Sequence, residues 1–118
     1  MATRHLTAAD FHEVAHSDGI VLVDFWADWC GPCKRFAPVF ESASERHQDI
    51  VFGKVDTEAE QALAIEFEVM SIPTIMAIRD GVVVFQRPGA LPEASLESLI
   101  SQVRALDMDE VRAKTQAA

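Results

Sequence analysis

The residues with the clearest chemical potential are two cysteines that stand three positions apart. Residues 30–33 read Cys-Gly-Pro-Cys, and the chain holds no other cysteine. At the start of a helix, this spacing places both thiols on one side of the first turn, within reach of a disulfide. Free backbone N–H groups and the positive end of the helix dipole favour a thiolate there. We therefore expect Cys30 to be the nucleophile and Cys33, one turn further in, to resolve the mixed disulfide.

The two residues between the cysteines also suit this chemistry. Pro32 fixes a backbone angle where a helix start tolerates the missing N–H, and Gly31 allows a partner to approach closely. A structural zinc site is disfavoured, because it needs four ligands and the chain's four histidines are scattered. A purely structural disulfide is disfavoured, because so short a loop removes little chain entropy and a cytoplasmic setting would keep it reduced.

An aspartate interrupts the apolar run just before the cysteine pair. Residues 20–26 read Ile-Val-Leu-Val-Asp-Phe-Trp, with Asp24 as the only charged side chain. An ionised carboxylate in a buried strand is unfavourable unless it is paired, so we expect burial to raise the pKa of Asp24. A raised pKa suits proton transfer near Cys33. Two points stay open. Asp24 could instead be an edge or surface residue without a catalytic role, and Lys54 either pairs with it or faces solvent.

The flanking sequence predicts the elements that position these residues. The run at 20–26 suits a central strand covered on both faces, and the strand-helix-strand unit after it implies parallel strands. Asp80-Gly81 favours a tight antiparallel turn at a sheet edge. The fold class is therefore α/β. In chain order we expect a helix at 7–16, a strand at 20–26, a helix at 34–47 kinked by Pro38, a strand at 50–56, a helix at 57–69, strands at 74–78 and 82–85, and a helix at 92–106.

Length and charge restrict the classes of function. A chain of 118 residues fits one domain, which we place at residues 1–106, followed by a polar C-terminal extension at 107–118. The formal net charge of -9 would repel a phosphate backbone, so we expect no nucleic-acid binding. No apolar run is long enough for a membrane span, and the first residues lack the apolar core of a secretory signal. We therefore expect a cytoplasmic protein without a membrane partner.

A longer stretch around the cysteines carries a family resemblance. Residues 23–34 read Val-Asp-Phe-Trp-Ala-Asp-Trp-Cys-Gly-Pro-Cys-Lys and resemble the active-site signature of the thioredoxin family. The resemblance covers about residues 5–106 and continues through Ala37-Pro38, residues 54–56, residues 71–74, Asp80-Gly81 and Gly89-Ala90. It implies the thioredoxin-like three-layer fold, with a central mixed sheet of four to five strands flanked by four helices.

The resemblance also implies roles for residues beside the cysteines. Asp24 would be the buried acid/base that assists Cys33, with Lys54 as its charge partner. Trp29 would flank the reactive sulfur, and Trp26 would pack under the motif.

A second segment gains its role from the resemblance alone. The Ile72-Pro73 bond would be cis, and its turn would lie against Cys30. The Ile72 backbone would pair with an extended substrate segment, and Gly89 would leave room for that segment. From the residues alone, a plain loop would be the simpler interpretation.

The activity implied is that of a protein-disulfide reductase. It would act on disulfide-containing client proteins as a monomer, bind no cofactor or metal, and be recharged by an NADPH-dependent flavoprotein, thioredoxin reductase. One alternative is a disulfide oxidant or isomerase, which usually works outside the cytoplasm and carries other residues between the cysteines. Another is a non-catalytic binding module with the same fold. Arg35, Pro88 and the extension depart from the commonest family pattern and leave partner choice open.

Overall fold

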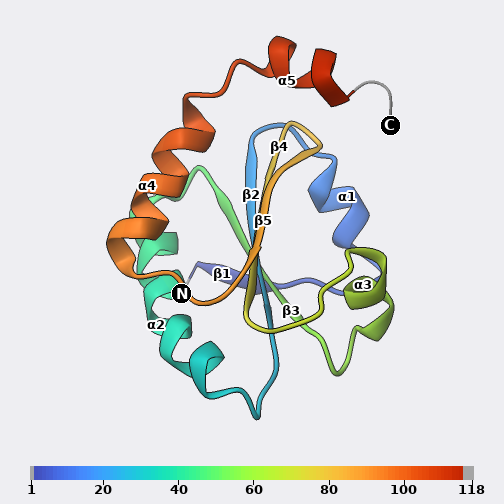
Figure 1. Ribbon diagram of the computed structural model, residues 1–118, viewed down its shortest axis with the longest axis vertical. Coiled ribbons are helices and arrows are strands. Elements are labelled where there is room, and N and C mark those ends of the chain that lie inside the picture. Colours follow the sequence, from blue (N-terminus) through green and yellow to red (C-terminus); the bar gives the residue numbers. More distant parts are fainter. Residues whose placement is uncertain (1, 116–118) are drawn as a thin grey trace.

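A five-stranded mixed sheet lies at the centre of the computed structural model, which describes residues 2–115 (Figure 1). Met1 and residues 116–118, the last of the expected extension, lie outside the described residues. The spatial order is β1-β3-β2-β4-β5. The first three strands are parallel, and β4 and β5 form an antiparallel hairpin. The strands are β1 (Thr3–His5), β2 (Ile20–Trp26), β3 (Val51–Asp56), β4 (Thr74–Arg79) and β5 (Val82–Pro88).

Helices cover both faces of the sheet, which gives three layers. In Figure 1, α2 and α4 lie on one side, and α1 and α3 lie on the other. The helices are α1 (Phe11–Ala15), α2 (Gly31–Arg46), α3 (Gln61–Glu66), α4 (Glu93–Arg104) and α5 (Met108–Thr115). The expected α/β fold, the central position of the strand at 20–26 and the antiparallel hairpin are confirmed. No helix in the described part of the chain is long and apolar enough to cross a membrane.

Alternation along the strands divides the apolar side chains between two cores. Leu22, Phe52 and Ile75 pack with α2 and α4 on one face. Val23, Val55 and Met76 pack with α1 and α3 on the other face. Asp24 has the parity of Leu22, which places it on the face that α2 covers.

Strand β1 was not predicted, and two helices are shorter than expected. The residues of β1 are polar and show no apolar alternation, so only their backbone pairing with β3 defines the strand. The expected helix at 7–16 begins only at Phe11, because residues 8–10 form a turn in which the Asp10 carboxylate accepts the Thr7 N–H at 2.7 Å. The expected helix at 57–69 is restricted to α3, because the Asp56 carboxylate holds the preceding turn through the Glu58 N–H at 2.9 Å.

Helix α2 begins three residues earlier than expected. Cys30 is its N-cap residue, and Pro32 lies in its first turn, where no intrahelical N–H is needed. Pro38 lies inside the helix, as expected. The cysteine pair therefore belongs to the helix start itself.

The tail beyond the four expected helices forms α5, which lies near the β4–β5 turn. The guanidinium of Arg79, at the end of β4, donates to three carbonyl oxygens at the C-terminal end of α4. The acceptors are Val103 O at 2.8 Å, Arg104 O at 3.1 Å and Leu106 O at 2.7 Å. Free carbonyl groups at a helix end need such donors. Arg79 thus joins the hairpin and α4 into one unit.

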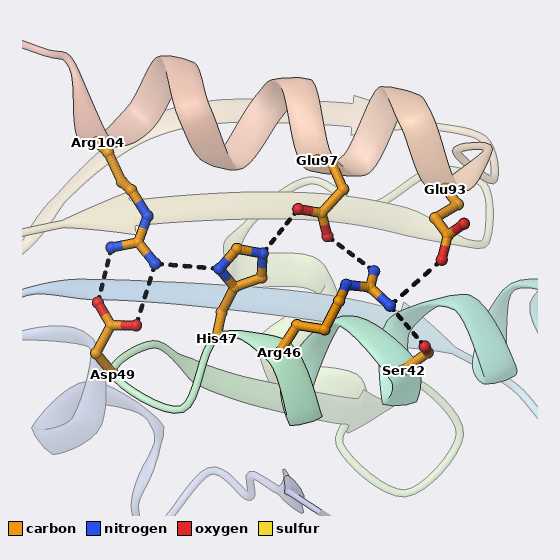
Figure 2. Close-up of polar contacts among 7 residues, drawn as sticks. All are labelled: Ser42, Arg46, His47, Asp49, Glu93, Glu97 and Arg104. Carbon is orange, nitrogen blue, oxygen red and sulfur yellow. Dashed lines mark hydrogen bonds and ion pairs between the residues drawn. The ribbon is translucent and has the colours of Figure 1, made fainter.

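A polar network joins the C-terminal end of α2 to α4 (Figure 2). Arg46 contacts Glu93 at 3.3 Å and Glu97 at 2.8 Å. His47 lies between Glu97, 2.8 Å from its Nε2, and Arg104, 3.2 Å from its Nδ1. A guanidinium only donates, so Nδ1 must accept and Nε2 must carry the hydrogen that is donated to Glu97. The network thereby selects the Nε2–H tautomer for the neutral imidazole of His47.

Candidate active site

The cysteine motif lies where β2 leads into α2. Cys30 has extended backbone angles, φ -88° and ψ 112°, that suit a helix N-cap, and Cys33 is the third residue of the helix. The two cysteines form a disulfide with their Cα atoms 5.2 Å apart. Each is only 3% exposed. The predicted proximity of the two sulfurs is confirmed.

Backbone groups surround the Cys30 sulfur. The Cys33 N–H donates to Cys30 Sγ at 3.2 Å, and the Ile72 carbonyl oxygen lies 3.7 Å from the same sulfur. An N–H group aimed at this position, together with the helix dipole, stabilises a thiolate when the disulfide is reduced. The arrangement therefore suits a nucleophile at Cys30.

The turn before β4 has the predicted cis bond between Ile72 and Pro73. Pro73 O accepts the Gly89 N–H at 2.7 Å, which ties this turn to the end of β5. Gly89 has φ +105°, a conformation that favours glycine, and nothing lies within 4 Å of where its Cβ would be. The space beside Gly89 is therefore open.

A groove of about 480 Å³ runs beside Cys30. Two of its residues are large exposed hydrophobic side chains, Trp29 at 70% and Met70 at 92% exposure. The lining residues are Trp29, Cys30, Pro32, Thr57, Val69, Met70, Ser71 and Ile72. Sequence reasoning missed Thr57, Val69, Met70 and Ser71 as groove residues. The signal for Val69 and Met70 was present, since two apolar residues directly precede the Ser-Ile-Pro segment after the apolar face of α3 has ended.

Asp24 is buried without a hydrogen-bond partner. It is 1% exposed, and neither carboxylate oxygen has a partner among the described residues. Loss of water raises the pKa of Asp24 from 3.8 to about 7, and the positive charge of Lys54 opposes part of that rise. The predicted direction of the shift is confirmed, and the surface alternative is wrong.

Lys54 is the register partner of Asp24 on β3, but it makes no direct ion pair with it. Its Nζ lies 5.2 Å from the centre of the Trp26 ring, so its charge acts on Asp24 from a distance. The indole Nε1 of Trp26 is also buried without a partner among residues 2–115. A cavity of about 100 Å³ brings Trp26, Cys33 and Lys54 together, with Ala27, Asp28, Lys34 and Ala37 completing its lining. Trp26 thus shares a cavity with Cys33 of the motif.

No cluster of three or more His, Cys, Asp or Glu side chains suited to a metal ion occurs in residues 2–115. The site brings together the cysteine pair and, on the preceding strand, a buried carboxylate with a raised pKa. A disulfide-forming pair at a helix start, beside an apolar groove, can exchange its disulfide with that of a bound polypeptide. Fold and site together define a thiol-disulfide oxidoreductase.

Comparison with known proteins gives the family. The family model for thioredoxin matches residues 2–102. A protein of Streptomyces coelicolor named "Putative thioredoxin 2" is 56% identical over 111 residues, covering 94% of this chain and 83% of that protein. The thioredoxin of Haemophilus influenzae is 44% identical over 100 residues, covering 83% of this chain and 94% of that protein. The chain belongs to the thioredoxin family, whose members are protein-disulfide reductases.

Solved structures agree with this assignment. The thioredoxin of Plasmodium falciparum has a TM-score of 0.79 and 34% identity, covering 85% of this chain and 98% of that one. A thioredoxin of Malassezia sympodialis has a TM-score of 0.78 and 31% identity, covering 86% of this chain and 93% of that one. The resemblance inferred from residues 23–34 is confirmed, and so is the three-layer α/β fold.

Proposed function

We propose that this chain reduces client disulfides with Cys30 as the nucleophile and Cys33 as the resolving thiol. The Cys30 thiolate attacks one sulfur of a client disulfide, forms a mixed disulfide and releases the other client sulfur as a thiolate. Cys33, deprotonated, then attacks Cys30 Sγ, which releases the second client thiolate and leaves the Cys30–Cys33 disulfide. Two electrons pass to the client. The observation that carries the proposal is the N-cap position of Cys30, where its sulfur accepts the Cys33 N–H at 3.2 Å.

Asp24 is the proposed proton acceptor for Cys33. A carboxyl group with a pKa of about 7 changes its protonation state near neutral pH, where general acid/base catalysis is most effective. It lies on the sheet face that α2 covers, the same helix that carries Cys33. Lys54 is the proposed positioning charge, since it limits the rise of the Asp24 pKa.

The client segment is proposed to lie extended in the groove beside Cys30. The Ile72 backbone pairs with it, and Trp29 and Pro32 pack against its side chains. Gly31 and Gly89 leave its backbone room, and Pro73 holds the turn that presents Ile72.

The wider setting is also part of the proposal. Electrons come from NADPH through a flavoprotein thioredoxin reductase, and this chain binds no cofactor of its own. It works in the cytoplasm as a monomer on disulfide-containing client proteins, and it binds neither nucleic acid nor membrane. Residues 1–106 form the catalytic domain, and residues 107–118 form an extension that is not needed for the reaction.

A trapping experiment tests the order of the two cysteines. Cys33→Ser should accumulate covalent client adducts on a non-reducing gel, because the mixed disulfide at Cys30 is no longer resolved. The matched Cys30→Ser variant should trap none. Adducts that form on Cys30→Ser, or none on Cys33→Ser, would reverse or remove the assignment.

The reduction potential of the cysteine pair separates a reductase from an oxidant or isomerase. Potentials of about -270 mV and about -180 mV are typical of thioredoxin and of protein disulfide isomerase. We expect a value near the first, measured against a graded dithiol buffer by following tryptophan fluorescence. A value near the second would replace the reductase with an oxidant or isomerase.

A further inference from the structure

The basic side chains differ in whether they have a partner. Five of the ten Lys and Arg residues form ion pairs with carboxylates: Arg4, Arg46, Arg79, Arg104 and Lys114. Arg112 donates to a backbone carbonyl, and Lys54 lies over an indole ring. The side chains of the other three, Lys34, Arg35 and Arg87, have no hydrogen bond, ion pair or ring contact within residues 2–115. Carboxylates outnumber cations in this chain, with a net charge of -9, so a cationic side chain without an acidic partner is unexpected.

Two of these cations, Lys34 and Arg35, directly follow the cysteine motif, and we call them the cationic flank. Both are exposed. Arg35 folds back over the motif, so that its Nη1 lies 3.5 Å from where a Cβ on Gly31 would be. Lys34 lines the cavity that also contains Cys33. The flank therefore places positive charge over Gly31 and at the rim of the cavity that Cys33 lines.

The flank is not explained by the stability of its helix. α4 begins with Glu93 and ends with Arg104, and α5 likewise begins with acidic and ends with basic residues. That distribution complements the helix dipole. α2 has no acidic residue in its first turn and carries two cations directly after it. Positive charge near a helix N-terminus is unfavourable, so the flank does not stabilise α2, and a negative charge at the Cys30 thiolate or on a partner would offset this cost.

We propose that the cationic flank selects clients whose reactive cysteine is followed or preceded by Asp or Glu in an otherwise apolar segment. This inference rests on the proposed function and names its substrate class. The groove holds the apolar part of the segment against Trp29 and Met70. Where the segment continues over Gly31, its carboxylate meets the Arg35 guanidinium, whose two parallel N–H groups match a carboxylate. Elsewhere the acidic surface repels such a segment, which directs it to this position.

Matched peptides test the selection. Three peptides share one disulfide and one apolar segment and differ only in the residue beside the reactive cysteine, which is Asp, Asn or Lys. The measurement is the second-order rate constant for their reduction by the reduced protein at low ionic strength. We expect the Asp peptide to react on the order of 10-fold faster than the Lys peptide, and the preference to disappear in about 0.5 M salt, where screening is nearly complete.

Two charge-matched variants locate the effect. Lys34→Glu/Arg35→Glu should abolish or reverse the preference for the Asp peptide, and it should fold, because Glu near a helix start suits the dipole. Arg112→Glu/Lys114→Glu makes the same change of charge on α5 and should keep the preference. Equal slowing of all three peptides by the flank variant would overturn the proposal and assign the flank to the Cys30 thiolate.

A neutral small disulfide, bis(2-hydroxyethyl) disulfide, separates this inference from the proposed function. If the wild-type protein reduces it but shows no preference among the peptides, the charge selection alone is wrong. If the wild-type protein reduces neither this compound nor any peptide, the proposed function fails, and the selection fails with it.

Discussion

The two ends of helix α2 differ in whether the polar side chains around them have partners. At its C-terminal end, the residues drawn in Figure 2 satisfy one another, with Arg46 and His47 both bound to Glu97. At its N-terminal end, Asp24 has no hydrogen-bond partner, and Arg35 has no acidic one among the described residues. We call these the paired end and the reactive end. The difference shows that one helix can be anchored at one end and leave groups free for chemistry at the other.

The contrast is clearest in two aspartates. At the paired end, hydrogen bonds from Arg104 lower the pKa of Asp49 from 3.8 to about 2. At the reactive end, burial raises the pKa of Asp24 from the same starting value to about 7. Pairing thus stabilises one charge, and isolation destabilises the other.

The largest expected effect lies at the reactive end. Cys30→Ser should reduce turnover with any disulfide client to the uncatalysed rate, because no other thiol lies beside the groove. The free energy of unfolding of the reduced protein should change by less than about 1 kcal/mol, since a hydroxyl replaces a thiol of similar size. Client reduction and chemical denaturation measure the two quantities. Catalysis that survives would contradict the role of Cys30, and a large loss of stability would remove the contrast between the ends.

Asp24→Asn should separate stability from activity. The folded pKa of about 7 lies above the unfolded value, so the folded state binds the proton more tightly and stability falls as pH rises from about 4 to about 7. At pH 8 the variant should be more stable by about 1–3 kcal/mol, because it lacks a buried charge but keeps a buried amide. Resolution of the mixed disulfide should be slower.

The control for Asp24→Asn is the pH dependence of the stability difference between the variant and the wild type. The gain in stability should fade toward pH 4, where the wild-type carboxyl is already neutral. Lower stability at pH 8 with an unchanged rate of resolution would be the contradicting result.

At the paired end we expect a small loss of stability and no change in the rate of client reduction. Arg104→Met removes two hydrogen bonds to Asp49 and one to His47, and should lower the free energy of unfolding by about 0.5–1 kcal/mol, as is typical of exposed ion pairs. NMR of the imidazole nitrogens should show the Nε2–H form of neutral His47 in the wild type and a mixture of tautomers in the variant. A single Nδ1–H form in the wild type would show that the network is assigned wrongly.

The smallest effect should come from Asp49→Asn. The folded pKa of about 2 lies below the unfolded value of 3.8, so ionised Asp49 stabilises the fold above about pH 4, and this stability is lost as pH falls through about 2. The variant should therefore melt slightly below the wild type at pH 7, and the two should converge in strong acid. Thermal unfolding between strong acid and pH 7 measures this difference. The effect on stability is opposite in sign to that of Asp24→Asn, which should stabilise the protein.

Local chemistry made the reactive end predictable from sequence. Residues adjacent in sequence are enough to recognise the Cys-Gly-Pro-Cys motif, the charged Asp24 in its apolar run, and the central strand. The cis bond at Pro73 came from the family resemblance, because the residues alone favour a plain loop. Groove residues such as Thr57 were missed, because Thr57 reaches the groove beside Cys30 only through tertiary packing.

The paired end could not be predicted, because its partners are distant in sequence. Arg46 and Glu97 meet only when α2 and α4 pack against the same face of the sheet. Strand β1 was missed for a related reason, since its pairing depends on the backbone of β3 and not on its own side chains. Interactions that depend on tertiary packing leave no periodic signal in a single chain.

The position of α5 has a practical consequence. It lies at the opposite end of the long axis from the loop that leads from β2 into α2 (Figure 1), and the Lys114 side chain is 73% exposed. A linker on this helix would hold the protein on an electrode or a bead with its cysteines facing the solution. Immobilised in that orientation, the protein would suit a reusable reagent for reducing disulfides in a flowing sample.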